Sequence, residues 1–233
     1  MLVNLQGTLN LLEAARLTGV SKFVFFSSVG VLPPAQYEPL DVRHPVLLAD
    51  KPPFNGFYSA SKLSGEAACW AYLERYGLDF VVVRPCTVYG FGESPALRVR
   101  PMIEDALTGR PTRIRTGLTV ARSYTHAADV ATVAVLAAMQ SAEVVEDRVF
   151  FGGTDGPMVT LGEIADIVRG LVPSADIEIG PELTDRERRE GLYRRPVSIE
   201  NARQQLGYEP RFPTMAEGLS DSVDKYRTWH ALQ

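Results

Sequence analysis

The 233-residue sequence predicts an α/β protein built on a parallel, doubly wound sheet. Two short runs, at 22–28 and 79–84, have the apolar, β-branched and aromatic content of strands buried on both faces. Each run follows a longer segment with the periodicity of a helix. Strands that alternate with helices in this way typically pair in parallel, because the helix returns the chain to the same end of the sheet.

The first half of the chain contains the clearest elements. Apolar residues at helical spacing predict a first helix with Gly19 as its stop (Leu5, Leu9, Leu12 and Ala15). The run Lys22–Ser28 is then expected to form a strand that ends in two hydroxyl residues. A proline-rich loop leads to a predicted helix from about Phe57 to Tyr76, and Pro85 ends the second strand.

Beyond Gly90 the alternation is looser. A short helix is expected over 101–109, an extended segment over 113–124, and a helix over Asp129–Met139 with Asp129 as its N-cap. The last third is expected to hold helices after Thr160, Ser198 and Thr214, a strand over 176–179, and a charged surface segment over 184–190.

Composition excludes several functional classes. The sequence is 45% hydrophobic and 22% charged with a net charge of −4, and its scattered basic residues form no stripe for nucleic acid and no polybasic membrane patch. No apolar run approaches the ~18 residues of a membrane helix. Cys69 and Cys86 lie in apolar stretches, which argues against a disulfide framework and favours a reducing, cytoplasmic setting. We therefore expect a small-molecule substrate and no metal site.

The segment Tyr58-Ser-Ala-Ser-Lys62 is the strongest chemical signal. Residues four apart share a helix face, so the phenol and the ammonium are expected to converge. A free tyrosine has a pKa of about 10, and a nearby lysine charge favours the phenolate form. Tyr58 could then exchange a proton with a hydroxyl or carbonyl oxygen. Because a tyrosine and a lysine four residues apart also occur by chance, the pair indicates a catalytic site only in combination with the motifs around it.

Hydroxyl residues at a strand end are a second signal. Ligands of an open parallel sheet bind beyond the carboxyl ends of its strands, where Ser27, Ser28 and Arg84–Thr87 are expected. The alternative is that the two serines only cap the strand or begin a turn.

In their order along the chain, these fragments resemble the extended short-chain dehydrogenase/reductase family, also called the NAD-dependent epimerase/dehydratase family. The resemblance covers nearly the full length and implies a Rossmann-type sheet with a small α/β C-terminal substrate lobe. The matching segments are Asn4-Leu-Gln-Gly7-Thr8-Leu-Asn10, Phe23-Val-Phe-Phe-Ser-Ser28, Tyr58-Ser-Ala-Ser-Lys62, Val83-Arg-Pro-Cys-Thr-Val-Tyr-Gly90, Arg122-Ser-Tyr-Thr-His-Ala-Ala-Asp129 and Leu206-Gly-Tyr-Glu-Pro210.

The resemblance implies roles for individual residues. Tyr58 is the implied catalytic acid/base, Lys62 tunes it and binds the nicotinamide ribose, and Ser28 orients the substrate oxygen. The positions that the resemblance places around the nicotinamide half of NAD or NADP are Asn4, Ser27, Tyr58, Lys62, Pro85 and Val88.

On the substrate side, the resemblance implies that Arg122 contacts a substrate phosphate, a role that suits the fork of guanidinium donors. Arg195, with its neighbour Arg194, is a second candidate for the substrate cleft. The alternative for these arginines is a solvated charge. His126 and Asp129 belong to a family signature and are interpreted as structural.

The sequence departs from the family pattern in two places. The Gly-x-x-Gly-x-x-Gly turn that holds the pyrophosphate is not found, nor is the residue that selects NAD or NADP, so we expect an N-terminally truncated chain whose sheet lacks its first strands. Residues 1–150 are expected to form a partial dinucleotide-binding domain, with part of the substrate lobe at about 90–125, and residues 151–233 mainly the substrate lobe. Val29 and Gly30 replace the acidic pair of the 4,6-dehydratases, which disfavours a dehydratase.

We therefore expect an NAD(P)-dependent oxidoreductase or epimerase that acts on a hydroxyl or carbonyl carbon of a sugar, in particular a nucleotide-linked sugar. Two alternatives stay open. One is a dehydrogenase of a non-sugar alcohol or ketone, and the other is a non-catalytic, poorly soluble remnant that does not bind cofactor productively. A homodimer through the helix that carries Tyr58 and Lys62 is expected by analogy.

Overall fold

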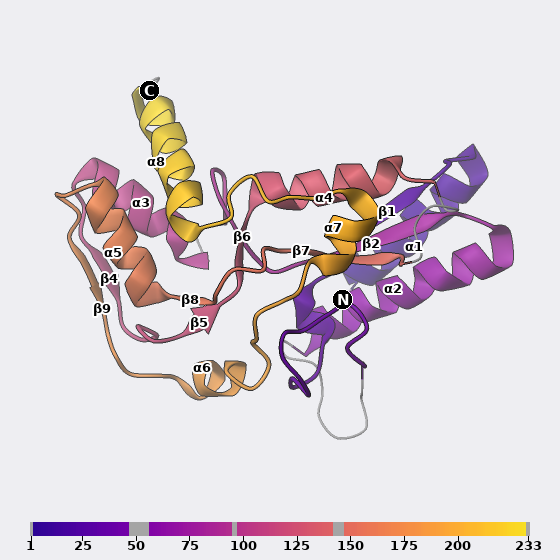
Figure 1. Ribbon diagram of the computed structural model, residues 1–233, viewed down its shortest axis with the longest axis horizontal. Helices are drawn as coiled ribbons and strands as arrows, with labels where there is room; N and C mark the ends of the chain where they lie inside the picture. The colour runs from indigo at the N-terminus through magenta and orange to yellow at the C-terminus, as the bar shows by residue number, and fades with distance from the viewer. Residues whose placement is uncertain (1, 47–55, 95–96, 142–146, 232–233) are drawn as a thin grey trace.

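The computed structural model describes residues 2–46, 56–94, 97–141 and 147–231. Its central sheet contains three parallel strands in the order β1 (Phe23–Phe26), β2 (Phe80–Pro85) and β7 (Val149–Gly152). Figure 1 shows helices on both sides of this sheet, so the predicted doubly wound α/β architecture is confirmed.

Both faces of β2 are buried, with side chains alternating between them as the period of a strand requires. Phe80 and Val82 pack with α1 (Leu2–Thr18) and α2 (Phe57–Tyr76) on one face. Val81 and Val83 pack with α4 (Ala127–Met139) and α7 (Glu200–Leu206) on the other. Burial of each such side chain stabilises the fold by roughly 1.5–3 kcal/mol, so β2 is the centre of the sheet energetically as well as in order.

The helix α2 has the bounds that the sequence predicts. Gly77 takes a left-handed conformation with φ of 70° and donates its backbone N–H to the carbonyl of Leu73, which ends the helix. A residue with a Cβ is strained in this conformation, so glycine suits the position.

A second core lies away from the sheet. The helices α3 (Val99–Thr108), α5 (Leu161–Leu171) and α8 (Met215–Ala231) pack around it. Short strands complete this region as three pairs, namely β3 (Thr87–Tyr89) with β6 (Tyr124–His126), β4 (Thr112–Ile114) with β9 (Ile177–Ile179), and β5 (Ala121–Arg122) with β8 (Val159–Thr160). The capping boxes predicted at Thr160 and Thr214 are both present.

The predicted N-cap of α4 is wrong. His126 occupies that position, and its ring Nδ1 accepts the backbone N–H of Ala128. Asp129 lies inside the first turn, where its two carboxylate oxygens accept the backbone N–H groups of Arg211 and Phe212 at 2.7 and 3.1 Å. Asp129 is structural, as expected, but it secures a distant loop rather than the start of its own helix.

The segment 184–190 is also more than a charged surface. It forms the helix α6 (Asp185–Glu190), which begins with a capping box between Thr184 and Glu187 and buries the side chains of Glu187 and Glu190. In Figure 1, long stretches without regular structure connect α6 to the rest of the chain on both sides.

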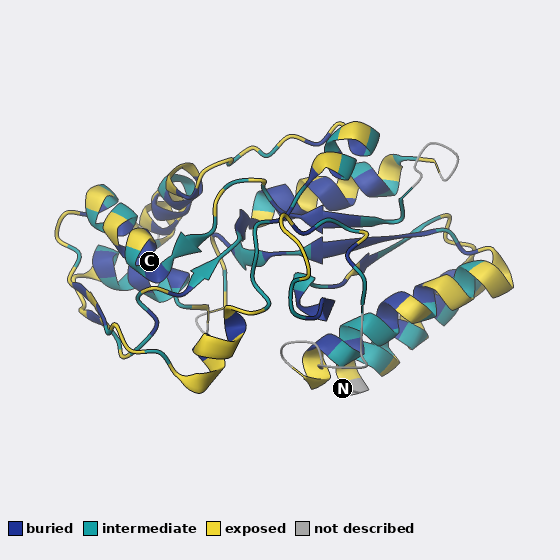
Figure 2. Ribbon diagram, turned by 60° about the horizontal axis from the view of Figure 1, so that its bottom comes forward, coloured by how far each residue is buried: buried dark blue, intermediate teal, exposed yellow. Residues whose placement is uncertain are grey.

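The buried side chains gather mainly at the sheet and in the second core, while α1, α2 and α6 carry exposed faces (Figure 2). Val197 and Tyr208, from the last third of the chain, pack into the core beside the sheet. The division of domains at residue 150 stays a prediction. Within the described ranges, no helix combines the length and the apolar character of a membrane span.

Candidate functional site

A cavity of about 850 Å³ opens where β1 and β2 end. Parallel strands end at the same edge of a sheet, so the residues that follow them meet there. The cavity brings together these sequence-predicted site residues: Ser27, Ser28, Tyr58, Lys62, Pro85, Val88 and Arg122. Asn4 and Arg195 are not among the described residues that line it. The roles of all of them stay predictions at this point.

Tyr58 and Lys62 lie one turn apart on α2, as their spacing predicts. The Lys62 Nζ lies 5.9 Å from the centre of the Tyr58 ring and donates to the backbone carbonyl of Phe26 at 2.7 Å. Burial lowers the pKa of Lys62. Tyr58 itself is 44% exposed, so the lysine is fixed against the end of β1 while the phenol is accessible from the cavity.

Ser28 has one of the two roles considered for it, that of a cap, and its contacts leave the other possible. It is the N-cap of the short 3₁₀ helix η1 (Val29–Val31), and its Oγ accepts the backbone N–H of Gly30 at 3.0 Å. A hydroxyl that accepts this bond retains its own proton. Ser28 therefore can cap the turn and still donate to an oxygen in the cavity.

A buried ion pair lies directly behind these groups, and the sequence reasoning missed it. Arg84, at the end of β2, donates to the carboxylate of Glu66 from Nε at 2.9 Å and from Nη2 at 2.7 Å. The Ser27 hydroxyl donates to the same carboxylate. All three side chains are buried. The available signals were an arginine inside an apolar strand and a glutamate one turn after Lys62.

This Ser27–Glu66–Arg84 cluster ties α2 to the ends of both strands. Glu66 lies four residues beyond Lys62 on the same helix face. Ser27 precedes Ser28, and Arg84 precedes Pro85. The cluster therefore fixes the spacing between the two groups of residues that line the cavity.

The two predicted residues outside the described lining have other partners. Asn4 donates from Nδ2 to the Ser61 hydroxyl at 3.0 Å, which joins α1 to α2. Arg195 donates from Nη1 to the carbonyl of Gly191 at 2.7 Å, and its Nε lies 3.5 Å from the Glu38 carboxylate. Its neighbour Arg194 is the one that lines the cavity.

The opposite wall of the cavity is rich in arginine. The described lining includes five basic and two acidic residues, a net formal charge of +3 in a chain of net charge −4 (Lys62, Arg98, Arg122, Arg186, Arg194, Glu187 and Glu190). A cavity with one sign of charge concentrates ligands of the opposite sign. This wall therefore favours an anionic ligand.

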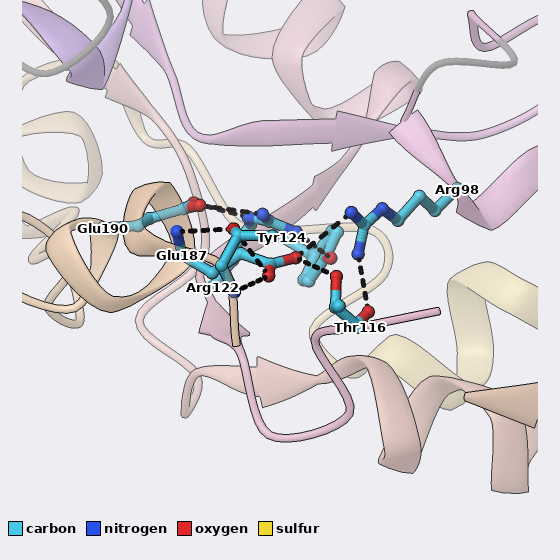
Figure 3. Close-up of polar contacts among 7 residues, drawn as sticks. Arg98, Thr116, Arg122, Tyr124, Glu187 and Glu190 are labelled. Atoms are coloured by element: carbon cyan, nitrogen blue, oxygen red, sulfur yellow. Dashed lines mark hydrogen bonds and ion pairs between the residues drawn. The ribbon is translucent and has the colours of Figure 1, made fainter. Parts of the chain in front are cut away.

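Both acids of this wall are paired with arginines (Figure 3). Arg122 donates to the Glu190 carboxylate from Nε at 2.6 Å and from Nη2 at 2.9 Å. Arg98 donates to Glu187 from Nη2 at 3.2 Å and to the backbone carbonyl of Thr116 from Nη1 at 3.1 Å. The acids come from α6 and the arginines from segments much earlier in the chain.

These pairs set the charge states of the wall. Burial alone would lower the pKa of Arg122, but its hydrogen bonds to Glu190 and Tyr124 and the charges of these two groups together outweigh burial and raise that pKa. Burial alone would raise the pKa of Glu190, but Arg122 and Arg194 outweigh it and lower that pKa. Both groups are therefore charged at neutral pH.

Comparison with known proteins adds family relationships. The NAD dependent epimerase/dehydratase family model matches residues 1–151. The UDP-glucose 4-epimerase of Mycolicibacterium smegmatis is 32% identical over 231 residues, which are 97% of this chain and 68% of that protein. The UDP-glucuronate 4-epimerase of Thermodesulfobacterium geofontis is 31% identical over 174 residues, which are 72% of this chain and 49% of that protein.

Solved structures show the same fold. The UDP-glucose 4-epimerase of Thermus thermophilus, in complex with NAD, has a TM-score of 0.77 at 28% identity over 97% of this chain and 70% of that one. The UDP-glucose 4-epimerase of Thermotoga maritima, with UDP-glucose, has a TM-score of 0.81 at 24% identity over 100% of this chain and 71% of that one, a likeness of fold alone.

The family match extends over more than half of the chain, and the 32% identical relative is covered over more than two thirds of its length. The motifs at Tyr58–Lys62 and at the strand ends predicted this relationship. The chain belongs to the NAD-dependent epimerase/dehydratase family.

Proposed function

We propose that this chain carries out hydride-transfer chemistry at a hydroxyl or carbonyl carbon of a nucleotide-linked sugar, with NAD or NADP as cofactor and epimerisation or net oxidation as the outcome. The observation that carries the proposal is a single cavity that joins Ser28, Tyr58 and Lys62 to a wall of net positive charge. The relatives named above, which include nucleotide-sugar 4-epimerases, support it.

The residues at the ends of β1 and β2 fit the nicotinamide half of such a cofactor. Lys62 would supply an ammonium to the ribose hydroxyls, and Pro85 and Val88 would supply an apolar edge beside the ring. Hydride acceptance and return are the chemistry that a bound nicotinamide supplies. The residues of the chain then have to orient the substrate and move one proton.

Tyr58 is the proposed acid/base. Its Oη takes the proton from a substrate hydroxyl as the carbon is oxidised and returns it on reduction, and the nearby Lys62 ammonium stabilises the phenolate. Ser28 donates a hydrogen bond to the same substrate oxygen. Because its other contact is with the Gly30 backbone, Ser28 holds this oxygen in a fixed position relative to β1.

The arginine wall favours a nucleotide-linked sugar over a neutral alcohol. A diphosphate carries negative charge that offsets most of the +3 of the lining residues, and guanidinium groups bind its oxygens in pairs. A neutral alcohol would leave these charges unmatched. The dehydrogenase of a non-sugar alcohol is therefore the less favoured alternative.

Replacement of the Tyr58 phenol tests the proposal. Tyr58→Phe is expected to abolish conversion of UDP-glucose to its 4-epimer in the presence of NAD while leaving UDP-glucose binding nearly unchanged. Tyr76→Phe, at an exposed tyrosine of the same helix, is the matched control and should retain full activity. Retained turnover by Tyr58→Phe would exclude the assigned role, and failure of the unaltered chain to bind NAD would favour the non-catalytic remnant.

A homodimer through α2 belongs to the same proposal. The residues Trp70 on α2 and Leu11 and Leu17 on α1 are half or more exposed, and apolar surface of this kind favours association. Light scattering should give twice the monomer mass, and Trp70→Glu should halve it. A monomeric unaltered chain would refute the dimer.

A further inference from the structure

Arg122 and Arg194 share one internal carboxylate on the substrate side of the cavity. Glu190 is only 4% exposed and accepts from Arg122 in a bidentate arrangement. Its Oε1 also accepts from the Arg194 Nε at 3.1 Å. Figure 3 shows the Arg122 guanidinium directed at this carboxylate. All three residues line the cavity, so the chain places its own anion where a ligand anion would bind.

The helix that carries Glu190 is attached to the rest of the protein in an unusual way. Its sequence, Asp-Arg-Glu-Arg-Arg-Glu, has no apolar side chain, and Glu187 and Glu190 are its only buried residues. Ion pairs to Arg98 and Arg122 therefore anchor the helix in place of a hydrophobic contact. Release of one carboxylate exposes no apolar surface to water, so the main cost is electrostatic.

A phosphate group can take the place of this carboxylate. Both groups present oxygens that match the guanidinium fork, and a diphosphate carries more negative charge than a carboxylate. If Arg122 turns to the ligand, Arg194 still neutralises Glu190, so no buried charge is left unpaired. The arrangement is thus suited to an exchange of anions.

We propose that Glu190 is a specificity-determining residue. Its carboxylate binds Arg122 as an internal anion, and it is displaced from Arg122 only by a ligand with the charge of a diphosphate. This inference rests on the proposed function, because it assumes a nucleotide-linked substrate in the same cavity. In this exchange α6 loses its ion pair to Arg122 and keeps those to Arg98 and Arg194. Ligands with a single phosphate group displace Glu190 less effectively, so the chain prefers diphosphates.

The test compares the affinities of the full chain for UDP and UMP, measured by calorimetry at one ionic strength. Glu190→Gln keeps the shape of the side chain and removes its charge. This variant is expected to bind UDP about tenfold more tightly, the equivalent of ~1.4 kcal/mol, and to prefer UDP over UMP by a smaller factor than the unaltered chain. Asp185→Asn removes an equal charge from an exposed position of α6 and should change Kd less than twofold.

The outcomes separate this inference from the proposed function. UDP binding to the unaltered chain with equal or weaker binding to Glu190→Gln would overturn the exchange alone. Absence of UDP binding by both proteins would overturn the nucleotide-linked substrate, and the inference with it.

Hydrogen exchange of the unaltered chain gives a second readout if Glu190→Gln does not fold. UDP is expected to speed amide exchange over residues 184–195, because α6 loses its ion pair to Arg122. Unchanged or slower exchange there would mean that phosphate adds to an intact cluster, and would overturn the proposal.

Discussion

Removal of the Glu66 carboxylate is expected to cause a large loss of stability. Glu66→Ala leaves the Arg84 guanidinium buried without its bidentate partner and leaves the Ser27 hydroxyl without its acceptor. Loss of one partner of a buried pair costs about 3–5 kcal/mol, because the remaining charge is not solvated. For a chain of this length each kcal/mol corresponds to about 2–4 °C in Tm, so we expect a decrease of roughly 6–20 °C.

Urea and thermal unfolding followed by circular dichroism measure this effect. The control is Glu13→Ala, which removes a half-exposed carboxylate paired with Arg16 on α1 and should lower Tm far less than Glu66→Ala does. The double variant Glu66→Leu/Arg84→Met should recover part of the loss, since it removes both buried charges. A cost for Glu66→Ala as small as that of the control would refute the assignment of Glu66 and Arg84 as a buried, mutually dependent pair.

Three further substitutions test other parts of the structure. Gly65→Ala would place a Cβ 2.3 Å from the Phe25 ring and should destabilise the chain by about 1–3 kcal/mol. The control is Gly7→Ala, whose Cβ meets no atom within 4 Å and which should not destabilise the chain. Thermal unfolding compares the two variants. Burial raises the pKa of Glu93 to about 7, so the contribution of Glu93 to folding stability is greatest below the ordinary glutamate pKa and is lost as pH rises through 7. In urea unfolding, Glu93→Gln should therefore gain stability relative to the unaltered chain between pH 5 and pH 8. A stability difference that does not change with pH would contradict this. Asp129→Ala should cost about 1–3 kcal/mol and speed hydrogen exchange at residues 211–212, whose amides it binds; unaltered exchange would contradict this.

Local signals in the sequence predicted the elements that local interactions determine. The bounds of α2 follow from its own residues and from the left-handed Gly77, and the capping boxes at Thr160 and Thr214 each involve residues three apart. The strand-end serines and the Tyr58–Lys62 pair line one cavity at the edge of the sheet, and their roles stay predictions.

Features that depend on distant partners were not predictable in this way. The run at 184–190 has the composition of a solvated surface, and Glu187 and Glu190 become buried only because Arg98 and Arg122 lie 89 and 68 residues earlier in the chain. Asp129 has the chemistry of an N-cap, but a loop 82 residues later takes up its carboxylate. A single sequence does not show such pairings, because the folded topology brings the partners together.

One face of α2 carries both the candidate catalytic groups and a residue on which the stability of the folded chain depends. Tyr58 and Lys62 lie on the same face as Glu66, which is held by Arg84. A one-residue insertion between Lys62 and Glu66 would rotate one half of the helix by about 100° relative to the other. The insertion would both misalign the candidate proton-transfer groups and leave a buried charge without its partner. In a cell, quality control that degrades unstable chains would therefore also remove those with a distorted site.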